Sequence, residues 1–525
     1  MMRFLFIVIM LFYMSVPLKR SLHMIQQNRY QSGRYQTWLG AAIQRQSRQI
    51  LWQTAAFLPL CGLFFLPDST ATWMFCCFCY ALYTWMWWYH EQQQSYIKKL
   101  VVTHRIRRLA LIQIAVLILI IVLGMVFLSR RMLLLILPFG YFLPWGTLFL
   151  ALWILTPVEQ RIRARYVKDA QQILGKRDDL MRIGITGSYG KTSVKHILAA
   201  LLSQQYYTYK TPHSYNNLMG LTLSIRTQLQ PLHQVFIAEM GADHVGEIEQ
   251  LARLVQPAIA IITAIGPQHL STFGSQENIV REKMRLVEQL PKDGIAVLNV
   301  DNSWIRAYPL SHPQTIITYG IHEETAMIKA VNIRYQATGT KFDVITPDGS
   351  FSLTTRLLGE HNVLNILGAV ACALALHVSP SKMISAVKNL PYTEHRLQAI
   401  DMGGYTLLDD SYNSNPEGAS YALDVLAAMS GKHFLMTPGF LDLGEATAAA
   451  HQAYAQKMAT CADEIILIGK LQTADIDSEL RKIHYPDSQI HIVDTTAEAF
   501  AYLREHASQG DCALIENDLP DAFNH

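Results

Sequence analysis

The segment MRIGITGSYGKTSVKHILAA, which starts at residue 181, contains the residue types that proteins use to hold a phosphate chain. A β-branched run leads into Gly187 and Gly190, and a helical stretch follows. Glycine permits the backbone angles that aim successive N–H groups at phosphate, and the dipole of the following helix adds to the attraction. Lys191 would neutralise the charge of the β- and γ-phosphates, and the Thr192 hydroxyl would bind Mg²⁺.

The spacing of this loop is tighter than the general P-loop pattern, because Ile185 stands where that pattern has its first glycine. The alternative interpretation is an ordinary turn between a strand and a helix. Gly-Lys-Thr-Ser at such a junction is a demanding combination, so we favour nucleotide binding. The residues of the segment that we expect to contact ATP are Gly187, Ser188, Gly190, Lys191, Thr192 and Ser193.

Three polar side chains farther along the chain are candidates for the same chemistry. Glu239 comes just past the apolar run VFIA, at the carboxyl end of a predicted parallel strand, where α/β proteins bind ligands. His269, in GPQHLSTFGS, also follows a strand, and Lys283 lies in the predicted helix ENIVREKMRLVEQL. On residue type alone, a solvated loop acid, a structural histidine and a surface lysine are the alternatives.

The elements that must position these residues follow a regular alternation. After the N-terminal third, short β-branched runs alternate with amphipathic helical stretches, which predicts βαβ units and a mostly parallel sheet covered by helices. Residues 325–356 instead predict strands with a turn at 346–350, and a helix over 362–376 follows. We therefore predict a central α/β domain over 175–390 and, after a short linker, a C-terminal α/β domain over 391–525.

Five ordered motifs follow the loop: TPHSYNNLMGLTLSI, VFIAEMGADHVGEIEQL, ITAIGPQHLSTFGSQENIVREKMRLVEQL, LLGEHNVLNILGAVACAL and LLDDSYNSNPEGASYALDVL. Together they resemble the Mur ligases, the ATP-dependent peptide ligases of cell-wall precursor synthesis, and most of all the D-alanyl-D-alanine-adding (MurF) branch. The resemblance covers about residues 180–525. It implies a P-loop Mur-ligase central domain with a parallel sheet and a Rossmann-like C-terminal α/β domain.

The resemblance also implies a role for each candidate residue. Glu239 would bind Mg²⁺, His269 would bind a second Mg²⁺, and Lys283 would be carbamoylated, which turns a cation into an anionic metal-binding group. Asn216 or Asn217 would touch the reacting carboxylate or the phosphates. The catalytic residues so implied are Lys191, Lys283, His269 and Asn216, and the metal ligands are Thr192, Glu239, His269 and Lys283.

Other residues of the same motifs would hold the nucleotide. Asn365, in GEHNVLN, resembles the adenine-reading asparagine of the family. Arg396 and Asp410 resemble residues that reach phosphate and ribose from the C-terminal domain, so the site would assemble only when that domain closes. Neighbouring polar residues of these motifs are His361, Asn362, Asn413 and Asn415.

These parts predict an ADP-forming carboxylate–amine ligase that uses ATP and Mg²⁺. A substrate carboxylate would attack the γ-phosphorus while Lys191 and the metal ions offset the charge of the transferring phosphoryl group. An amine would then attack the acyl phosphate to form an amide. This route needs no covalent nucleophile, in keeping with the lack of a Ser-His or Cys-His constellation. The expected partners are a cell-wall precursor carboxylate and an amino acid or dipeptide.

The first third of the chain predicts a different structure, a multi-pass membrane domain over residues 1–160. Five apolar runs in it contain no charged residue, and the last three reach the length of about 20 residues that a membrane-crossing helix needs. The first run lacks a cleavage site, so we interpret it as an uncleaved anchor. The runs are Phe4–Leu18, Ile50–Leu66, Ala71–Tyr89, Leu109–Ser129 and Met132–Pro157.

Basic residues gather in three of the segments that flank these runs. The positive-inside rule makes those segments cytoplasmic, which places the catalytic domains in the cytoplasm and the N-terminus outside. Arg130 and Arg131, in the fourth loop, count mildly against this orientation. The three basic groups are Lys19, Arg20, Arg29, Arg34, Arg45 and Arg48, then Lys98, Lys99, Arg105, Arg107 and Arg108, then Arg161, Arg163, Arg165 and Lys168.

The substrate half departs from the family pattern. MurF-type ligases carry a soluble N-terminal domain that grips UDP, whereas membrane segments precede Met181 here. The C-terminal domain reads MTPGFLDLGE where a glycine-aspartate turn is usual, and it ends in LIENDLPDAFNH without a lysine-glycine-serine-arginine-like ending. We therefore expect an acceptor presented at the cell membrane, such as a polyprenyl-linked cell-wall precursor, with membrane lipid as a partner.

Three alternatives remain open from the sequence: a membrane-bound synthase of poly-γ-glutamate type, a P-loop transport motor and an inactive scaffold. No LSGGQ-like stretch follows the loop, which weakens the transport alternative. Joint retention of Lys191, Thr192, Glu239, His269 and Lys283 argues against a scaffold. The net charge of +3 favours no particular partner, and we expect no nucleic acid. Four of the seven cysteines lie in apolar segments and the other three are scattered along the chain, so neither zinc nor a disulfide framework is indicated.

Overall fold

The structure is a computed structural model of the whole chain. It divides into two compact units, Met1–Arg165 and Tyr166–His525, which are described separately. The residues described are 2–28, 30–45, scattered positions in 69–89, 100–128, 140, 142–212, 215–268, 270–310, 315–336, 339–391, 395, 397–411, 416–440 and 447–517.

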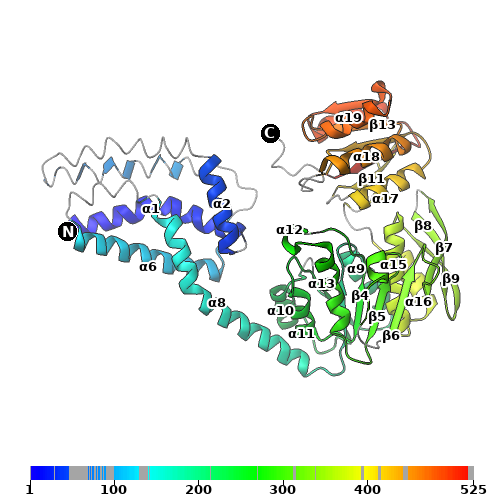
Figure 1. Cartoon of the computed structure of the whole chain (residues 1–525), viewed down its shortest axis with the longest axis horizontal. Coiled ribbons are helices and arrows are strands. Elements are labelled where there is room, and N and C mark those ends of the chain that lie inside the picture. Colours follow the sequence, from blue (N-terminus) through cyan, green and yellow to red (C-terminus); the bar gives the residue numbers. More distant parts are fainter. Residues whose placement is uncertain are drawn as a thin grey trace. The chain divides into compact units, whose positions relative to one another are not determined.

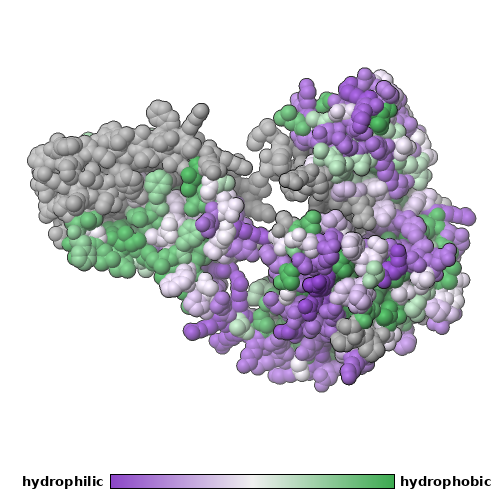
Figure 2. Space-filling model, viewed as in Figure 1, coloured by the Kyte–Doolittle hydropathy of each residue, from purple (hydrophilic) through white to green (hydrophobic). Residues whose placement is uncertain are grey.

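The described part of the N-terminal unit is helical. A small apolar core joins its helices through Ile25, Tyr35, Leu109 and Leu148, and Figure 2 shows mainly apolar side chains on the described surface of this unit. The helices are α1 (Met2–Gln27), α2 (Ser32–Arg45), α6 (His104–Phe127) and α8 (Leu143–Gly175), and the last turns of α8 belong to the second unit.

Helix α6 is the one helix of the described residues that is long and apolar enough to cross a membrane. Leu109 and Leu117 lie on its buried face, whereas Leu111 and Phe127 are exposed although they are apolar. Apolar side chains on an outer surface fit a lipid or protein environment better than water. The composition of α6 therefore agrees with the predicted run over 109–129.

The other predicted membrane runs are tested only in part. The first run lies in α1, and the end of the last run lies in α8. The run over 50–66, parts of 71–89 and residues 132–139 lie outside the described residues. The structure thus supports a helical N-terminal region with one apolar helix, and a multi-pass domain stays a prediction.

The second unit begins with a nine-stranded sheet in the order β2-β3-β1-β4-β5-β6-β7-β8-β9. Figure 1 labels strands β4 to β9 of this sheet. The strands from β2 to β7 pair in parallel, as the alternation of strands and helices predicted. These strands are β1 (Met181–Thr186), β2 (Thr208–Lys210), β3 (Val235–Glu239), β4 (Ile259–Ile262), β5 (Ile295–Asn299), β6 (Thr315–Gly320), β7 (Ile328–Gln336), β8 (Gly339–Thr346) and β9 (Gly349–Thr355).

Helices cover both faces of the central sheet, because its strands bury alternate side chains in two separate cores. In β3, Val235 and Ile237 face the core under α9, α15 and α16, whereas Phe236 and Ala238 face the core under α10, α11 and α13. The helices are α9 (Lys191–Leu202), α10 (Leu218–Thr227), α11 (Glu247–Val255), α12 (Leu270–Phe273), α13 (Gln276–Glu288), α14 (Ser303–Arg306), α15 (Glu360–Ala375) and α16 (Pro380–Lys388).

Residues 328–355 extend the sheet with antiparallel strands. β7 pairs with β8, and β8 pairs with β9 through a turn between Thr346 and Gly349. Both the strands and the position of this turn confirm what the sequence predicted for 325–356. The predicted helix over 362–376 is present as α15, which begins two residues earlier, at Glu360.

The rest of the second unit contains a six-stranded sheet in the order β10-β11-β15-β12-β13-β14. Its pairs are parallel except β10 with β11, which agrees with the second α/β set of the sequence. The elements are β10 (Gln398–Asp401), β11 (Thr406–Asp410), α17 (Pro416–Ala427), β12 (His433–Thr437), α18 (Thr447–Cys461), β13 (Glu464–Ile468), α19 (Ala474–Lys482), η4 (Asp487–Gln489), β14 (Ile490–Val493), α20 (Thr496–His506) and β15 (Cys512–Glu516).

Candidate active site

The loop between β1 and α9 needs both of its glycines. Gly187 has φ +155°, and a Cβ there would lie 2.1 Å from Thr263 Oγ1. Gly190 has φ +80°, and a Cβ there would lie 2.4 Å from Asn365 Oδ1. Any larger residue would be both strained and obstructed at these positions. The glycine spacing of the sequence is therefore a packing requirement of this turn.

The segment that directly follows the neighbouring strand β4 holds this loop from the side. The Ser188 hydroxyl donates to the Gly266 carbonyl at 3.0 Å, and the Ser188 N–H donates to the Ala264 carbonyl at 2.6 Å. The Thr263 hydroxyl also donates to the Tyr189 carbonyl. These contacts fix the loop before any ligand arrives, so a phosphate would meet a preorganised backbone.

Helix α9 begins at this loop with Lys191, Thr192 and Ser193 in its first turn. Its N-cap, Gly190, is in the left-handed conformation and has no side chain to cap the helix. In the part of the chain that the structure describes, the N–H groups of Thr192 and Ser193 donate to no side chain. Such N–H groups at a helix N-terminus form a site for an anion.

The Lys191 ammonium lies over the loop. Its Nζ donates to the Gly187 carbonyl at 2.7 Å and to the Ser188 carbonyl at 2.9 Å. These two bonds fold the side chain back over the backbone that precedes the helix. The cation therefore stands beside the first turn of α9, where it can add to the attraction for phosphate.

Glu239, the last residue of β3, is buried with 1% of its surface exposed, and it collects several partners. The Thr192 hydroxyl donates to its two carboxylate oxygens at 3.0 and 3.1 Å. The Asn216 amide donates to Oε1 at 3.2 Å. The parallel pairing of β1 with β3 sets Ile185 beside Glu239, so the carboxylate lies next to the loop. Three of the predicted site residues thus meet at one point.

The structure separates the two asparagines that the sequence left as alternatives. Asn216 contacts Glu239, whereas Asn217 is the N-cap of α10 and accepts a hydrogen bond from the Gly220 N–H at 2.9 Å. Asn217 therefore has a structural partner of its own, and Asn216 is the one that faces the carboxylate.

Lys195 also binds Glu239 and was not predicted from the sequence. Its Nζ lies 2.9 Å from Glu239 Oε2, and its side chain is fully buried. A signal for it exists: Lys195 follows Lys191 by one helical turn and stands among the apolar residues that α9 buries. A lysine on the buried face of a helix needs an anionic partner, and Glu239 supplies it.

Lys283, in α13, is buried with 3% of its surface exposed. Its Nζ donates to the Ala242 carbonyl at 3.1 Å and lies 5.7 Å from the centre of the Phe273 ring. Burial, and then the positive charge of Lys191, lower the pKa of Lys283 to about 7, against the smaller raising effects of Glu282, Glu247 and Asp243. The amine is therefore substantially uncharged near neutral pH, unlike an exposed lysine.

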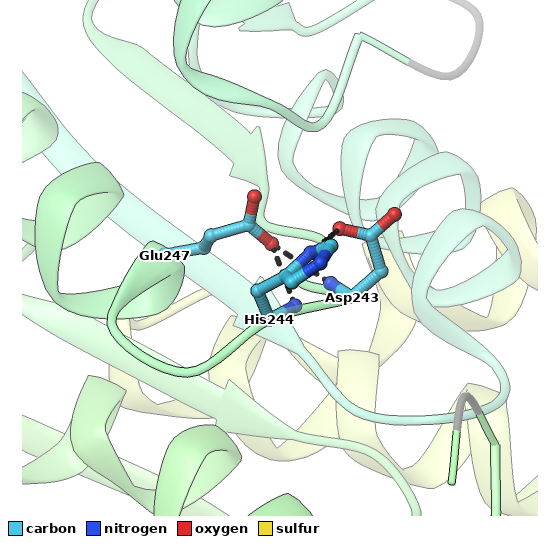
Figure 3. A group of neighbouring side chains, drawn as sticks. All are labelled: Asp243, His244 and Glu247. Atoms are coloured by element: carbon cyan, nitrogen blue, oxygen red, sulfur yellow. Dashed lines mark hydrogen bonds and ion pairs between the residues drawn. The ribbon is translucent and has the colours of Figure 1, made fainter. Parts of the chain in front are cut away.

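The turn after β3 and the first residue of α11 hold an unpredicted group of polar side chains, Asp243, His244 and Glu247. Their possible ligand atoms lie within 4.8 Å of one another. Figure 3 shows the His244 ring against the Asp243 carboxylate and Glu247 directed at the backbone of the turn. The His244 Nδ1 lies 2.8 Å from Asp243 Oδ1. Glu247 Oε2 accepts from the N–H groups of Asp243 and His244 at 2.8 and 3.0 Å. These bonds account for the arrangement as a stabilised turn.

The predicted nucleotide residues are described only in part. Asn365 is buried, and its Oδ1 lies against Gly190 of the loop. Asp410 ends β11, and its Oδ1 accepts from the Leu397 N–H at 3.0 Å. Four other predicted residues lie outside the described residues: His269, Arg396, Asn413 and Asn415.

Two family models match this chain. The Mur ligase middle domain matches residues 185–373, and the Mur ligase glutamate ligase domain matches residues 395–516. The UDP-N-acetylmuramoyl-tripeptide–D-alanyl-D-alanine ligase of Escherichia coli (strain K12) is 31% identical over 330 residues, which are 61% of this chain and 73% of that protein. The chain belongs to the Mur ligase family. It is an ATP-dependent amide ligase, which excludes the transport alternative.

Solved structures give the same result for the fold. MurF from Acinetobacter baumannii superposes with a TM-score of 0.59 at 26% identity, over 68% of this chain and 77% of that one. MurF from Thermotoga maritima in complex with ADP superposes with a TM-score of 0.60 at 23% identity, over 68% of this chain and 80% of that one. The matched Mur-ligase domains begin after the N-terminal helical region, at residue 185.

Proposed function

We propose that this Mur ligase joins a cell-wall precursor carboxylate to the amine of an amino acid or dipeptide, as a MurF-like enzyme of peptidoglycan precursor synthesis. The observation that carries the proposal is the meeting of Lys191, Thr192, Asn216 and Glu239 at the open N-terminus of α9. The substrate class is taken from the similar D-alanyl-D-alanine ligases.

The reaction has two steps. A carboxylate oxygen attacks the γ-phosphorus of ATP, the bond from that phosphorus to the β,γ-bridging oxygen breaks, and ADP leaves. The amine nitrogen then attacks the acyl carbon, the carbon–oxygen bond to phosphate breaks, and phosphate leaves as the nitrogen loses a proton. Lys191 and the first-turn N–H groups of α9 offset the charge on the phosphoryl oxygens. Asn216 orients Glu239 and faces the reacting groups.

Mg²⁺ fits the side chains beside the loop. The Thr192 hydroxyl oxygen and a Glu239 carboxylate oxygen lie 3.0 Å apart. Both are oxygen ligands, which suit this hard cation. Lys283, whose lowered pKa favours the free amine, can take up CO₂ as a carbamate and become an anionic ligand. We assign Thr192, Glu239, carbamoylated Lys283 and His269 as the metal ligands. When bound, Mg²⁺ supplies positive charge to the phosphoryl group during transfer.

The remaining assignments complete the nucleotide site. Asn365 reads adenine, and Arg396 and Asp410 reach phosphate and ribose from the C-terminal domain, which closes over the bound nucleotide. The buried position of Asn365 against the glycine loop supports the first of these assignments.

The acceptor is presented at the membrane. The N-terminal region is a multi-pass membrane domain of about five helices, and the catalytic domains are cytoplasmic. The apolar helix α6, with its exposed apolar face, supports a membrane location. A membrane-linked precursor, such as a polyprenyl-linked one, would then lie close to the ligase.

Turnover of defined substrates tests this function. The full chain, purified in detergent with ATP and Mg²⁺, is given UDP-linked or lipid-linked muropeptide together with radiolabelled amino acids or dipeptides. ADP release and the product mass identify both substrates. We expect amide product with the lipid-linked acceptor and none with Lys191→Ala. Preference for the soluble UDP form would reject the membrane-linked acceptor, and no amide product with either acceptor would reject the function.

A further inference from the structure

A pocket of about 300 Å³ opens within the N-terminal unit, where the chain between α1 and α2, the start of α6 and the middle of α8 meet. Its lining has two chemical halves. Tyr30, Arg105 and Glu159 form a polar half, and Phe149, Leu152 and Trp153 form an apolar half. A pocket with a polar half and an apolar half matches an amphiphilic ligand, which has a polar head and an apolar body.

Arg105 is the polar group of the pocket with the most unused binding capacity. Its guanidinium lies over the Tyr30 ring, 3.9 Å from the ring centre, and its side chain is 25% exposed. Its Nε is 3.7 Å from Glu159 Oε2, which is too far for a hydrogen bond. Among the described residues Arg105 donates no hydrogen bond, so its fork of N–H donors is available to a ligand.

The charges around the pocket leave a positive excess. Glu159 is buried, and Arg108 binds its Oε1 through Nε at 2.8 Å and Nη2 at 2.6 Å. Arg163 lies close enough to Arg105 for the two charges to repel. The single carboxylate of Glu159 therefore faces the positive charges of three guanidinium groups. These groups lie near the N-terminus of α6, where the helix dipole is also positive. An anion in the pocket would relieve this repulsion.

The Tyr30 ring is held in place before any ligand binds. The Tyr30 N–H donates to the Ile25 carbonyl at 2.8 Å, and Gln26 Nε2 donates to the Tyr30 hydroxyl at 3.3 Å. The same hydroxyl lies 3.5 Å from Thr103 Oγ1, the cap of α6. Because the fixed ring already holds Arg105 in position, less conformational entropy is lost when a ligand binds.

The apolar half determines what kind of anion fits. Trp153 lines the pocket and is 75% exposed, so the pocket opens onto the outer surface of α8. Leu150 and Ile154 beside it are exposed as well. Free phosphate would leave this apolar wall uncovered, whereas the chain of a lipid would bury it.

We propose that this pocket binds the phosphate head group of an anionic lipid, with Arg105 on the phosphate and the lipid chain against Trp153. The site needs neither ATP nor the ligase substrates, so it can be tested apart from the proposed reaction. It would seat a lipid-linked phosphate at the N-terminal unit whichever acceptor the ligase uses.

Direct lipid binding tests the proposal. Fluorescently labelled dioleoyl phosphatidic acid and dioleoyl phosphatidylcholine are titrated with the full chain in detergent, without ATP, and anisotropy gives the affinities. We expect at least about tenfold tighter binding of phosphatidic acid, and about a tenfold loss with Arg105→Gln. Arg161→Gln, an exposed arginine of α8 outside the pocket, removes the same charge and should change the affinity by less than about twofold.

A second variant reports on the lipid chain and does not disturb the charges. Trp153→Ala should weaken dioleoyl phosphatidic acid severalfold and leave the short dihexanoyl form unchanged, and it carries the test if Arg105→Gln fails to fold. Equal binding of the two labelled lipids, or equal losses with Arg105→Gln and Arg161→Gln, would overturn the proposal. Displacement of the lipid by millimolar inorganic phosphate would also overturn it, because the site would then be one for a free anion.

Discussion

Two helices of the central domain, α9 and α11, have similar N-termini, but different groups occupy those two N-termini. Each follows a strand of a neighbouring parallel pair, β1 or β3, and each has a left-handed glycine as its N-cap, Gly190 or Gly246. At α11 the buried Glu282 carboxylate accepts from the N–H groups of Gly246 and Ile248 at 2.8 and 2.7 Å.

At α9 no carboxylate takes that position among the described residues. The nearest one, Glu239, accepts from the Thr192 hydroxyl and binds Lys195 and Asn216. The strand–glycine–helix geometry is therefore not what makes a phosphate site, since the protein builds it twice. The difference is that the protein fills one helix N-terminus with its own anion and leaves the other open beside Lys191.

The largest expected effect comes from removing the cation at the open helix. Lys191→Ala should lower ATP turnover by at least about 10³-fold, because the charge that offsets the phosphoryl oxygens is lost. ADP release by the full chain in detergent measures it. Lys292→Ala removes an exposed lysine of the same domain and should leave the rate unchanged. Equal rates in both variants would end the distinction between α9 and α11.

The second largest effect is expected from breaking the ion pair between Lys195 and Glu239. Lys195→Met leaves a buried carboxylate without its ammonium partner and should cost about 3 to 5 kcal/mol of unfolding free energy. The urea midpoint of the full chain in detergent reports this loss. Lys195→Arg keeps the charge and should recover much of it. A Lys195→Met protein as stable as the parent would show that Glu239 does not depend on this pair.

Removing Glu282 from the N-terminus of α11 tests the same comparison with the other helix. Glu282→Ala leaves two N–H groups without their acceptor and should destabilise the protein by about 2 to 3 kcal/mol. Added sulfate should restore part of the urea midpoint, because α11 would then resemble α9. Glu277→Ala, which removes an exposed acid of the same helix, should lower the urea midpoint much less than Glu282→Ala does. Sulfate rescue of both variants alike would contradict the interpretation.

The smallest expected effect, counted per pH unit, is a pH dependence from Lys283, which lies beside Glu282. Burial lowers the pKa of Lys283 in the folded protein to about 7, below its ordinary value of 10.5, so between these values the unfolded chain binds more protons. Unfolding free energy should therefore rise above pH 7, by about 1 kcal/mol per pH unit.

The measurement compares the parent with Lys283→Met in buffer free of CO₂, so that no carbamate forms. The urea midpoint of the parent should rise with pH relative to that of the variant. Parallel pH profiles for the two proteins would mean that the folded state does not depress the pKa of Lys283.

Residue spacing predicted the loop and the residues at strand ends because such features are local. Gly187, Gly190 and Lys191 follow one strand directly, and Glu239 ends its neighbour, so parallel pairing brings them together. Lys195 and Glu282 were missed because their roles depend on partners 44 and 34 to 36 residues away, which only the folded sheet brings close. The choice between Asn216 and Asn217 likewise needed the position of α10.

The N-terminal region was harder to predict for a different reason. Hydropathy indicates which segments avoid water, and it located the run that became α6. It does not report pairwise contacts between helices, so the bonds of Arg108 with Glu159 and the stacking of Arg105 on Tyr30 carried no signal in the sequence. Charged residues there suggested orientation alone.

The central claim is that the open end of α9 supports phosphoryl transfer from ATP to a substrate carboxylate. It is tested most directly by an acceptor whose carboxylate carries ¹⁸O, incubated with the full chain, ATP, Mg²⁺ and the amine. We predict ADP as the nucleotide product and transfer of one labelled oxygen from the carboxylate into inorganic phosphate. Label in AMP, or inorganic phosphate without label while amide forms, would contradict this account.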